Sequence, residues 1–83
     1  MKIQVRFFAS LREALGSVEE VELPEGSTLG DLRDVLLARG GRYPVVLARD
    51  RAVRCALNHV LLDESTVIDA GAEVAFFPPV TGG

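Results

Sequence analysis

The sequence predicts an α+β fold in which one main helix packs on one face of a mixed β-sheet. Alternating apolar and polar residues occur near both ends of the chain, which is typical of half-buried strands. One segment between them has the apolar spacing of an amphipathic helix. The chain has 83 residues, a length that accommodates a single domain with a single core.

The first strand is expected at residues 3–7 (IQVRF). Its core-facing side chains are Ile3, Val5 and Phe7. A helix of about two turns should follow, because Ser10 and Glu13 have the spacing of a capping box and Gly16 supplies a stop.

The second strand is expected to pair antiparallel with the first. Val21 and Leu23 lie on its core face, and a proline-glycine turn ends it within VELPEG at 21–26. Three acidic residues are interpreted as a solvated face of this strand: Glu19, Glu20 and Glu22. The alternative is a docking patch for a basic partner.

The main helix is expected to begin at Thr28, an N-cap residue, with Asp31 near the positive end of the helix dipole. Its apolar stripe comprises Leu29, Leu32 and Leu36, widened by Val35 and Leu37. The opposite face carries Asp31, Asp34 and Ala38. Gly40-Gly41 should terminate the helix.

Residues 42–52 allow two interpretations. Tyr43-Pro44 is expected to be extended, because the residue before a proline avoids the helical region. Residues 45–48 then form either a helical turn, begun by Pro44 at its first position, or a short strand.

The remaining strands are expected at 53–58, 60–62 and 73–77, with a tight turn at Asn58-His59 and another at 69–71. The predicted core-facing residues are Val53, Cys55, Leu57, Val74 and Phe76, and the predicted outward residues are Ala75 and Phe77. A helix on one face of such a sheet is a two-layer α+β solution. If the last strand pairs beside the first, this is the β-grasp, or ubiquitin-like, fold. We expect a domain at 1–77 and an extended, flexible tail at 78–83.

Composition excludes several functional classes. The net charge is −3 and Lys2 is the only lysine, so no basic stripe for nucleic acid is expected. One cysteine and one histidine cannot supply the roughly three or four ligands of a zinc or iron–sulfur site. We expect no bound cofactor. There is neither an apolar run of about 20 residues nor a signal-like N-terminus, which predicts a cytoplasmic protein without membrane contact.

Two residue types with catalytic potential have simpler interpretations. Cys55 alternates with apolar neighbours, which favours a buried thiol over a nucleophile. His59 follows Asn58 and precedes an apolar run, which favours a turn residue over a general base.

The segment FFPPVTGG at 76–83 combines stiffness with a small cross-section. Pro78-Pro79 fixes φ twice and ends the strand. Residues 78–83 reach roughly 20 Å when extended, and Gly82-Gly83 lets the backbone pass where a Cβ would clash. The terminal carboxylate, with a pKa of about 3.5, is a poor electrophile and needs activation by a partner.

Three stretches carry a family resemblance: DAGAEVAFFPPVTGG at 69–83, KIQVRFFASLREALG at 2–16 and ALN at 56–58. The sequence resembles the small, sulfur-carrying subunit of molybdopterin synthase, in the MoaD/ThiS-like group of ubiquitin-like proteins. The resemblance spans essentially the whole chain.

The resemblance implies a sulfur-transfer cycle. An E1-like adenylyltransferase would use ATP to adenylate Gly83, and a sulfur-donating enzyme would convert the adenylate to a thiocarboxylate. The tail, with Gly82 beside the reacting residue, would enter the large subunit and donate sulfur to cyclic pyranopterin monophosphate. The catalytic residues would belong to the large subunit. The implied interface residues are Phe77 and Leu61, and Pro78, Pro79, Val80 and Thr81 extend that surface.

Three alternatives remain open. A sulfur carrier for thiamine or tRNA thiolation would share the fold and the Gly-Gly segment, although the FFPPV run argues against it. A ubiquitin-like modifier would form isopeptide bonds, and having Lys2 alone argues against lysine-linked chains. The last alternative is an interaction module with an inert tail.

Overall fold

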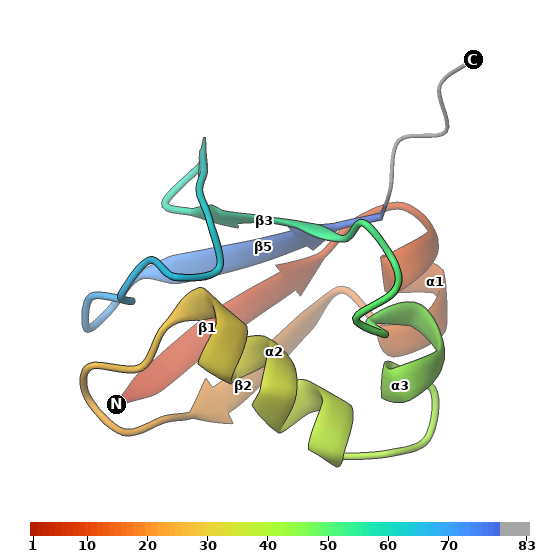
Figure 1. The fold of residues 1–83 in the computed structure, drawn as a ribbon, viewed down its shortest axis with the longest axis horizontal. Coiled ribbons are helices and arrows are strands. Elements are labelled where there is room, and N and C mark those ends of the chain that lie inside the picture. The colour runs from red at the N-terminus through yellow and green to blue at the C-terminus, as the bar shows by residue number, and fades with distance from the viewer. Residues whose placement is uncertain (79–83) are drawn as a thin grey trace.

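The computed structural model describes residues 1–78, which form three helices and five strands. In chain order the elements are β1 (Lys2–Phe7), α1 (Ser10–Leu15), β2 (Val18–Glu22), α2 (Leu29–Ala38), α3 (Tyr43–Val46), β3 (Arg54–Leu57), β4 (Val60–Leu61) and β5 (Glu73–Phe77) (Figure 1). The predicted α+β class is confirmed. Of the predicted tail, only Pro78 falls within the described residues.

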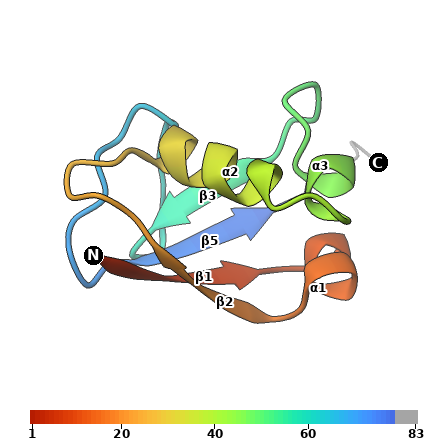
Figure 2. The same cartoon turned by 90° about the horizontal axis from the view of Figure 1, so that it is seen from below.

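The strands form one mixed sheet in the order β2-β1-β5-β3-β4. β1 runs antiparallel to β2 and parallel to β5, whereas β3 runs antiparallel to both β5 and β4. Helix α2 lies across one face of the sheet, and α1 and α3 lie at the end toward which β1 and β5 run (Figure 2). The predicted β-grasp arrangement is confirmed, and the last strand occupies the centre of the sheet.

The core lies between α2 and the sheet. Side chains from β1, β5 and α2 that are at most 1% exposed include Ile3, Val5, Phe7, Val74, Phe76, Leu29, Leu32 and Leu36. The rings of Phe7 and Phe76 stack with centroids 6.2 Å apart, which fixes the two central strands against each other. Burying each such side chain stabilises the fold by about 1.5–3 kcal/mol, so β1 and β5 are held by the core on their helix-facing side.

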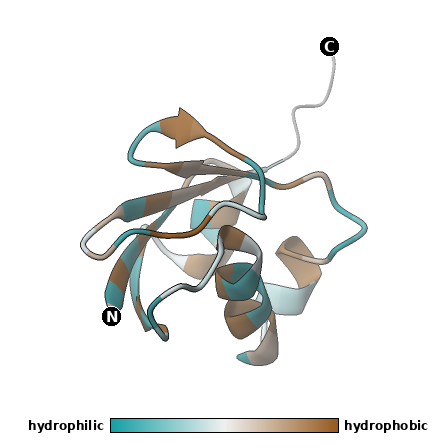
Figure 3. Ribbon diagram, turned by 60° about the vertical axis from the view of Figure 1, so that its left-hand side comes forward, coloured by the Kyte–Doolittle hydropathy of each residue, from teal (hydrophilic) through white to brown (hydrophobic). Residues whose placement is uncertain are grey.

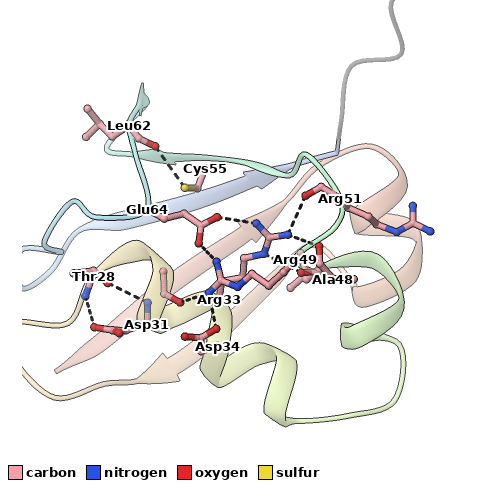
Figure 4. Close-up of polar contacts among 12 residues, drawn as sticks. Thr28, Asp31, Arg33, Asp34, Ala48, Arg49, Arg51, Cys55, Leu62 and Glu64 are labelled. Carbon is pink, nitrogen blue, oxygen red and sulfur yellow. Dashed lines mark hydrogen bonds and ion pairs between the residues drawn. The ribbon is translucent and has the colours of Figure 1, made fainter.

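The start of α2 is fixed by hydrogen bonds that the sequence predicts in part. The Asp31 amide donates to Thr28 Oγ1 at 3.1 Å and the Thr28 amide donates to Asp31 Oδ2 at 2.9 Å, which is a complete capping box (Figure 4). The Gly30 amide also donates to the Glu64 carbonyl at 2.8 Å. A Cβ on Gly30 would meet that carbonyl at 3.3 Å, so the close approach favours glycine.

The prediction of a capping box at Ser10 is wrong. Ser10 is the first residue of α1, and the N-cap is Ala9, which makes no side-chain cap bond. The Ala9 carbonyl accepts from the Arg12 amide at 3.0 Å, so the backbone turns one residue before the serine. The stop at Gly16 is confirmed, because its φ is 96° and its amide donates to the Arg12 carbonyl at 2.9 Å.

Two further local predictions need correction. Tyr43 is helical rather than extended, and Pro44 is the second residue of α3 rather than the first, so the helical interpretation holds for residues 45–46 but not for 47–48. The Tyr43 ring packs edge-on against Phe7 at 6.4 Å, and this tertiary contact outweighs the local restriction before proline. Val35 is 38% exposed and does not widen the buried stripe of α2.

The three acidic residues of the second strand do not share one face. Glu20 and Glu22 are exposed, whereas Glu19 is half-buried and its Oε1 lies 3.1 Å from Arg39 Nη1 beyond the end of α2. Because side chains alternate along a strand, Glu19 lies on the helix side and its neighbours on the other. Val53, predicted in the core of a strand at 53–58, is only half-buried and precedes β3.

Candidate functional site

The sheet face opposite α2 carries a row of small side chains at its centre. The strand register places Arg6, Ala75, Ala56 and Leu61 side by side across β1, β5, β3 and β4. Ala56 is 4% exposed although it faces away from the helices, because larger neighbours stand around it. The two alanines therefore form the floor of a depression in the outer face.

This depression is a hollow of about 650 Å³. Its apolar lining comprises Phe8, Ala56, Leu61, Ala75, Phe77 and Pro78, and its polar rim comprises Arg6, Arg54, His59 and Glu73. An apolar hollow with a polar rim has the composition of a protein-binding surface. We call it the outer hollow.

Two stacked aromatic rings form one wall of the outer hollow. The centroids of Phe8 and Phe77 lie 4.9 Å apart and the ring planes differ by 9°. Phe77 points outward as predicted, and it is half-buried by this stacking. Phe8 was not predicted from the sequence as part of the site. The sequence did contain a signal for Phe8: Phe7 faces the core, so side-chain alternation places Phe8 on the opposite face. The pairing of β1 with β5 then brings it next to Phe77.

The opposite wall is the hairpin that carries Leu61. Asn58 and His59 have positive φ angles of 48° and 71°, which are those of a two-residue turn, so the predicted turn is confirmed. The Glu73 amide donates to Asn58 Oδ1 at 3.0 Å and thereby anchors the turn to β5. Leu61 is 54% exposed, and the hydrophobic short strand stands clear of the helices (Figure 3).

Of the two arginines on the rim, one has an ion-pair partner among the described residues and the other has none. Arg6 Nε lies 3.2 Å from Glu73 Oε2, which forms an ion pair across β1 and β5. Arg54 is exposed, lies directly across from Phe77 in the sheet, and makes no ion pair with any residue of the described part of the chain. The rim therefore retains one positive charge on a protein whose net charge is −3.

Cys55 lies on the helix-facing side of the sheet, in the core, rather than in the outer hollow. It is 4% exposed, and its Sγ donates to the Leu62 carbonyl at 3.6 Å. Burial, followed by the negative charge of Glu64, raises the pKa of the Cys55 thiol. A thiol with a raised pKa is a poor nucleophile, so the interpretation as a core residue is confirmed.

The raised pKa predicts an alkaline loss of stability that depends on Cys55. The folded state favours the neutral thiol, so this contribution is complete below the unfolded thiol pKa of about 8.5 and is lost as pH rises through the folded value. Urea unfolding near pH 7 and near pH 9.5 should show a larger drop for the wild type than for Cys55→Ala. Equal drops in the two proteins would contradict the assignment.

The structure brings together all the predicted interface residues that it describes. Phe77, Leu61 and Pro78 line the outer hollow. The remaining predicted site residues, Pro79, Val80, Thr81, Gly82 and Gly83, lie outside the described residues. Residues 1–78 contain neither a cluster of three potential metal ligands nor a helix long and apolar enough to cross a membrane.

A five-stranded sheet that holds one long helix and has its last strand at the centre defines a ubiquitin-like β-grasp protein. The chain belongs to the ThiS family, whose profile matches residues 5–83.

Curated relatives match over their full length. A molybdopterin synthase sulfur carrier subunit from Mycobacterium tuberculosis is 38% identical over 85 residues, which span 100% of this chain and 99% of the relative. One from Escherichia coli is 37% identical over 81 residues, which span 98% and 99%. The family resemblance recognised from the sequence is confirmed.

Solved structures agree on the fold. A Haloferax volcanii protein determined in solution superposes with a TM-score of 0.84 at 30% identity and covers 100% of this chain and 87% of its own. Small archaeal modifier protein 1 from the same organism gives 0.76 at 27% identity, with 95% and 98% covered.

Proposed function

We propose that this chain is the sulfur-carrying small subunit of a molybdopterin synthase. The observation that carries the proposal is the full-length similarity to curated sulfur carrier subunits of that enzyme. The fold supports it, because β5 lies between β1 and β3 and delivers Pro78 from the centre of the sheet. A reactive segment that continues from β5 begins at a strand that is hydrogen-bonded to a neighbour on each side.

The proposed cycle begins at the Gly83 carboxylate. An ionised carboxylate resists nucleophilic attack, so an E1-like partner first joins it to AMP from ATP and releases pyrophosphate. A sulfur-donating enzyme then displaces AMP and leaves a thiocarboxylate. Inside the large subunit the thiocarboxylate sulfur forms a bond to a carbon of cyclic pyranopterin monophosphate. Water then hydrolyses the bond between that sulfur and the acyl carbon, so the sulfur stays on the pterin and Gly83 returns as a carboxylate. We place this cycle in the cytoplasm.

In this cycle the domain provides docking and positioning, and the large subunit provides the catalytic residues. The only thiol of the chain is buried and the only histidine lies in a turn. The outer hollow, with Phe77 and Leu61 on its walls, adjoins Pro78 at the base of the tail. A partner bound there would therefore hold its active site at a fixed distance from the tail.

Intact-mass spectrometry tests the proposal directly. The chain is incubated with its activating enzyme, ATP and the sulfur donor, and replacement of one terminal oxygen by sulfur is expected. The product is then added to the large subunit and pyranopterin precursor, which should yield the dithiolene and restore the original mass. An unmodified mass in the first step would refute a carrier role, and failure of the second step alone would indicate a carrier for another pathway.

Similarity to small archaeal modifier protein 1 favours a ubiquitin-like modifier as the second candidate. Such a role would produce covalent conjugates of the chain with other proteins. Lys2 lies at the start of β1, at the opposite end of the sheet from Pro78, and its Nζ is 3.9 Å from Glu20 Oε1. Conjugates that appear when the activating enzyme is co-expressed, in place of a thiocarboxylate, would support this candidate.

Replacing Phe77 with alanine is expected to weaken binding of the large subunit. Loss of its buried area, about 1.5–3 kcal/mol, corresponds to a dissociation constant roughly tenfold to a hundredfold higher. The stacked pair with Phe8 is lost as well, so the free energy of unfolding should fall by about 1 kcal/mol.

Titration calorimetry and urea unfolding measure these two effects separately. Val35→Ala on the exposed side of α2 is the control, because it truncates an exposed apolar side chain away from the outer hollow. Unchanged affinity of Phe77→Ala would remove Phe77 from the interface.

A further inference from the structure

We propose that the subunit bound at the outer hollow places a carboxylate against Arg54 and an apolar side chain over Ala56 and Ala75. This inference rests on the proposed function, because it specifies the chemistry of the large subunit at the same face. It assigns to Arg54 a role in selecting the partner.

Arg54 cannot be avoided by a partner that covers the predicted interface. It is paired directly with Phe77 across β3 and β5, so their Cβ atoms are about 5 Å apart. It precedes Ala56 by two residues on the same face of β3, a spacing of about 7 Å. Because Leu61 lies on the other side of Ala56, Arg54 lies within the surface that Phe77 and Leu61 define.

The charge of Arg54 needs a counter-ion once that surface is covered. The other arginine of the outer hollow already has one, because Arg6 pairs with Glu73. Among residues 1–78, Arg54 has no such partner. A guanidinium that loses water without gaining an anion opposes binding, so a partner that binds well has to supply a carboxylate.

The floor of the outer hollow defines the second requirement. Ala56 and Ala75 are the smallest side chains that line the outer hollow, and the Phe8–Phe77 stack and Leu61 stand above them. A flat partner would leave this space unfilled and lose the packing contacts there. A protruding apolar side chain fills it, and the adjacent carboxylate then meets Arg54 at the rim.

The central test measures binding of the large subunit by titration calorimetry to Arg54→Gln, Arg54→Glu and the wild type. We expect the dissociation constant to rise roughly tenfold for Arg54→Gln and roughly a hundredfold for Arg54→Glu. Arg42→Glu is the matched control, because it makes the same charge change at an exposed position before α3, and it should bind like the wild type. Equal affinity of Arg54→Glu and Arg42→Glu would overturn the proposal.

A charge-reversal rescue identifies the partner residue. Each acidic residue on the docking surface of the large subunit is changed to arginine and combined with Arg54→Glu. One combination should recover at least tenfold of the lost affinity, whereas no recovery with any of them would contradict a direct carboxylate contact. Ala75→Leu tests the hollow itself, because leucine is tolerated in a strand and its side chain would fill the floor of the hollow. We expect this variant to bind the large subunit more weakly, and unchanged affinity would contradict insertion of a partner side chain.

These outcomes separate the inference from the function on which it rests. If the wild-type chain forms a thiocarboxylate and binds the large subunit but the Arg54 variants bind equally well, only the inference fails. If the wild-type chain does not bind the large subunit at all, the proposed function fails and the inference with it. Self-association of the isolated chain that Arg54→Glu abolishes would assign this face to a second copy and overturn the proposal.

Discussion

Deletion of Gly83 is expected to reduce sulfur transfer to background while leaving the domain as stable as the wild type. The proposed reacting atom is the terminal carboxyl carbon, and removing one residue retracts it by about 3.5 Å. Reacting atoms must approach within about 3–3.5 Å in the correct orientation, and a misplacement of about 1 Å can already cost a hundredfold in rate. A shortened chain would therefore dock normally and fail to deliver its sulfur.

Gly82 should be sensitive for a different reason. In the proposed cycle the tail passes through a narrow partner site, where a side chain at this position would add a Cβ, so Gly82→Val is expected to be at least a hundredfold slower in single-turnover transfer. Gly83→Ala is the informative control, because it keeps both the length and the terminal carboxylate and should retain measurable transfer.

Sulfur transfer is measured by mass spectrometry of the thiocarboxylate, and stability by urea unfolding. Unfolding free energies of all these variants should agree within about 0.5 kcal/mol, since the substitutions lie outside the β-grasp domain. Wild-type turnover by the shortened chain would refute chemistry at Gly83.

The parts of the fold that follow local rules could be predicted from the sequence. Thr28 is the N-cap of α2 as expected, and Asp31, expected only to favour the helix dipole, completes a capping box with it. Asn58 and His59 form the expected two-residue turn. Ser10 shows the limit of such rules. Its spacing to Glu13 matches a capping box, but the N-cap of α1 is Ala9, one residue earlier.

The parts of the site that depend on strand pairing could be predicted only partly. Phe77 was identified by alternation and by family resemblance, but its contact with Phe8 requires the parallel pairing of β1 with β5. Arg54 likewise becomes part of the outer hollow only when β3 lies next to β5. Such neighbours are far apart in the sequence, and no local pattern specifies them.

Arg33 was missed although its position contained a signal. It lies four residues after Leu29 and three before Leu36, which places it on the buried side of α2. Helical spacing therefore predicts that Arg33 is buried, and it is 3% exposed. The spacing does not reveal its hydrogen-bond partners, because these come from a loop and from the segment after β4.

Replacement of Arg33 is expected to be the most destabilising single polar substitution in the domain. Its Nε donates to the Leu47 carbonyl at 2.8 Å, and its Nη2 donates to the carbonyls of Ala48 at 2.5 Å and Arg51 at 3.2 Å. Its Nη1 lies 2.7 Å from Glu64 Oε2 (Figure 4). One guanidinium thus links α2 to residues 47–51 and to the chain between β4 and β5.

Arg33→Met keeps the length of the side chain and removes every donor. Three backbone carbonyls and the Glu64 carboxylate would each lose the hydrogen bond that Arg33 donates, which should lower the free energy of unfolding by about 3–5 kcal/mol. This is a large fraction of the 5–15 kcal/mol that is typical of a folded domain. Arg33→Lys retains the charge but lacks the planar fork that reaches several acceptors, so we expect an intermediate loss.

Urea unfolding of Arg33→Met, Glu64→Gln and the double variant measures how far the two residues act as one unit. Because both single changes disrupt the same ion pair, the double variant should lose less than the sum of the two. Arg49 donates to Glu64 and to Asp34 and remains in place, so part of the contribution of Glu64 should survive the loss of Arg33. Strict additivity would show that Arg33 and Glu64 contribute independently. A loss below 1 kcal/mol for Arg33→Met would show that the hydrophobic core alone holds residues 47–51 against α2.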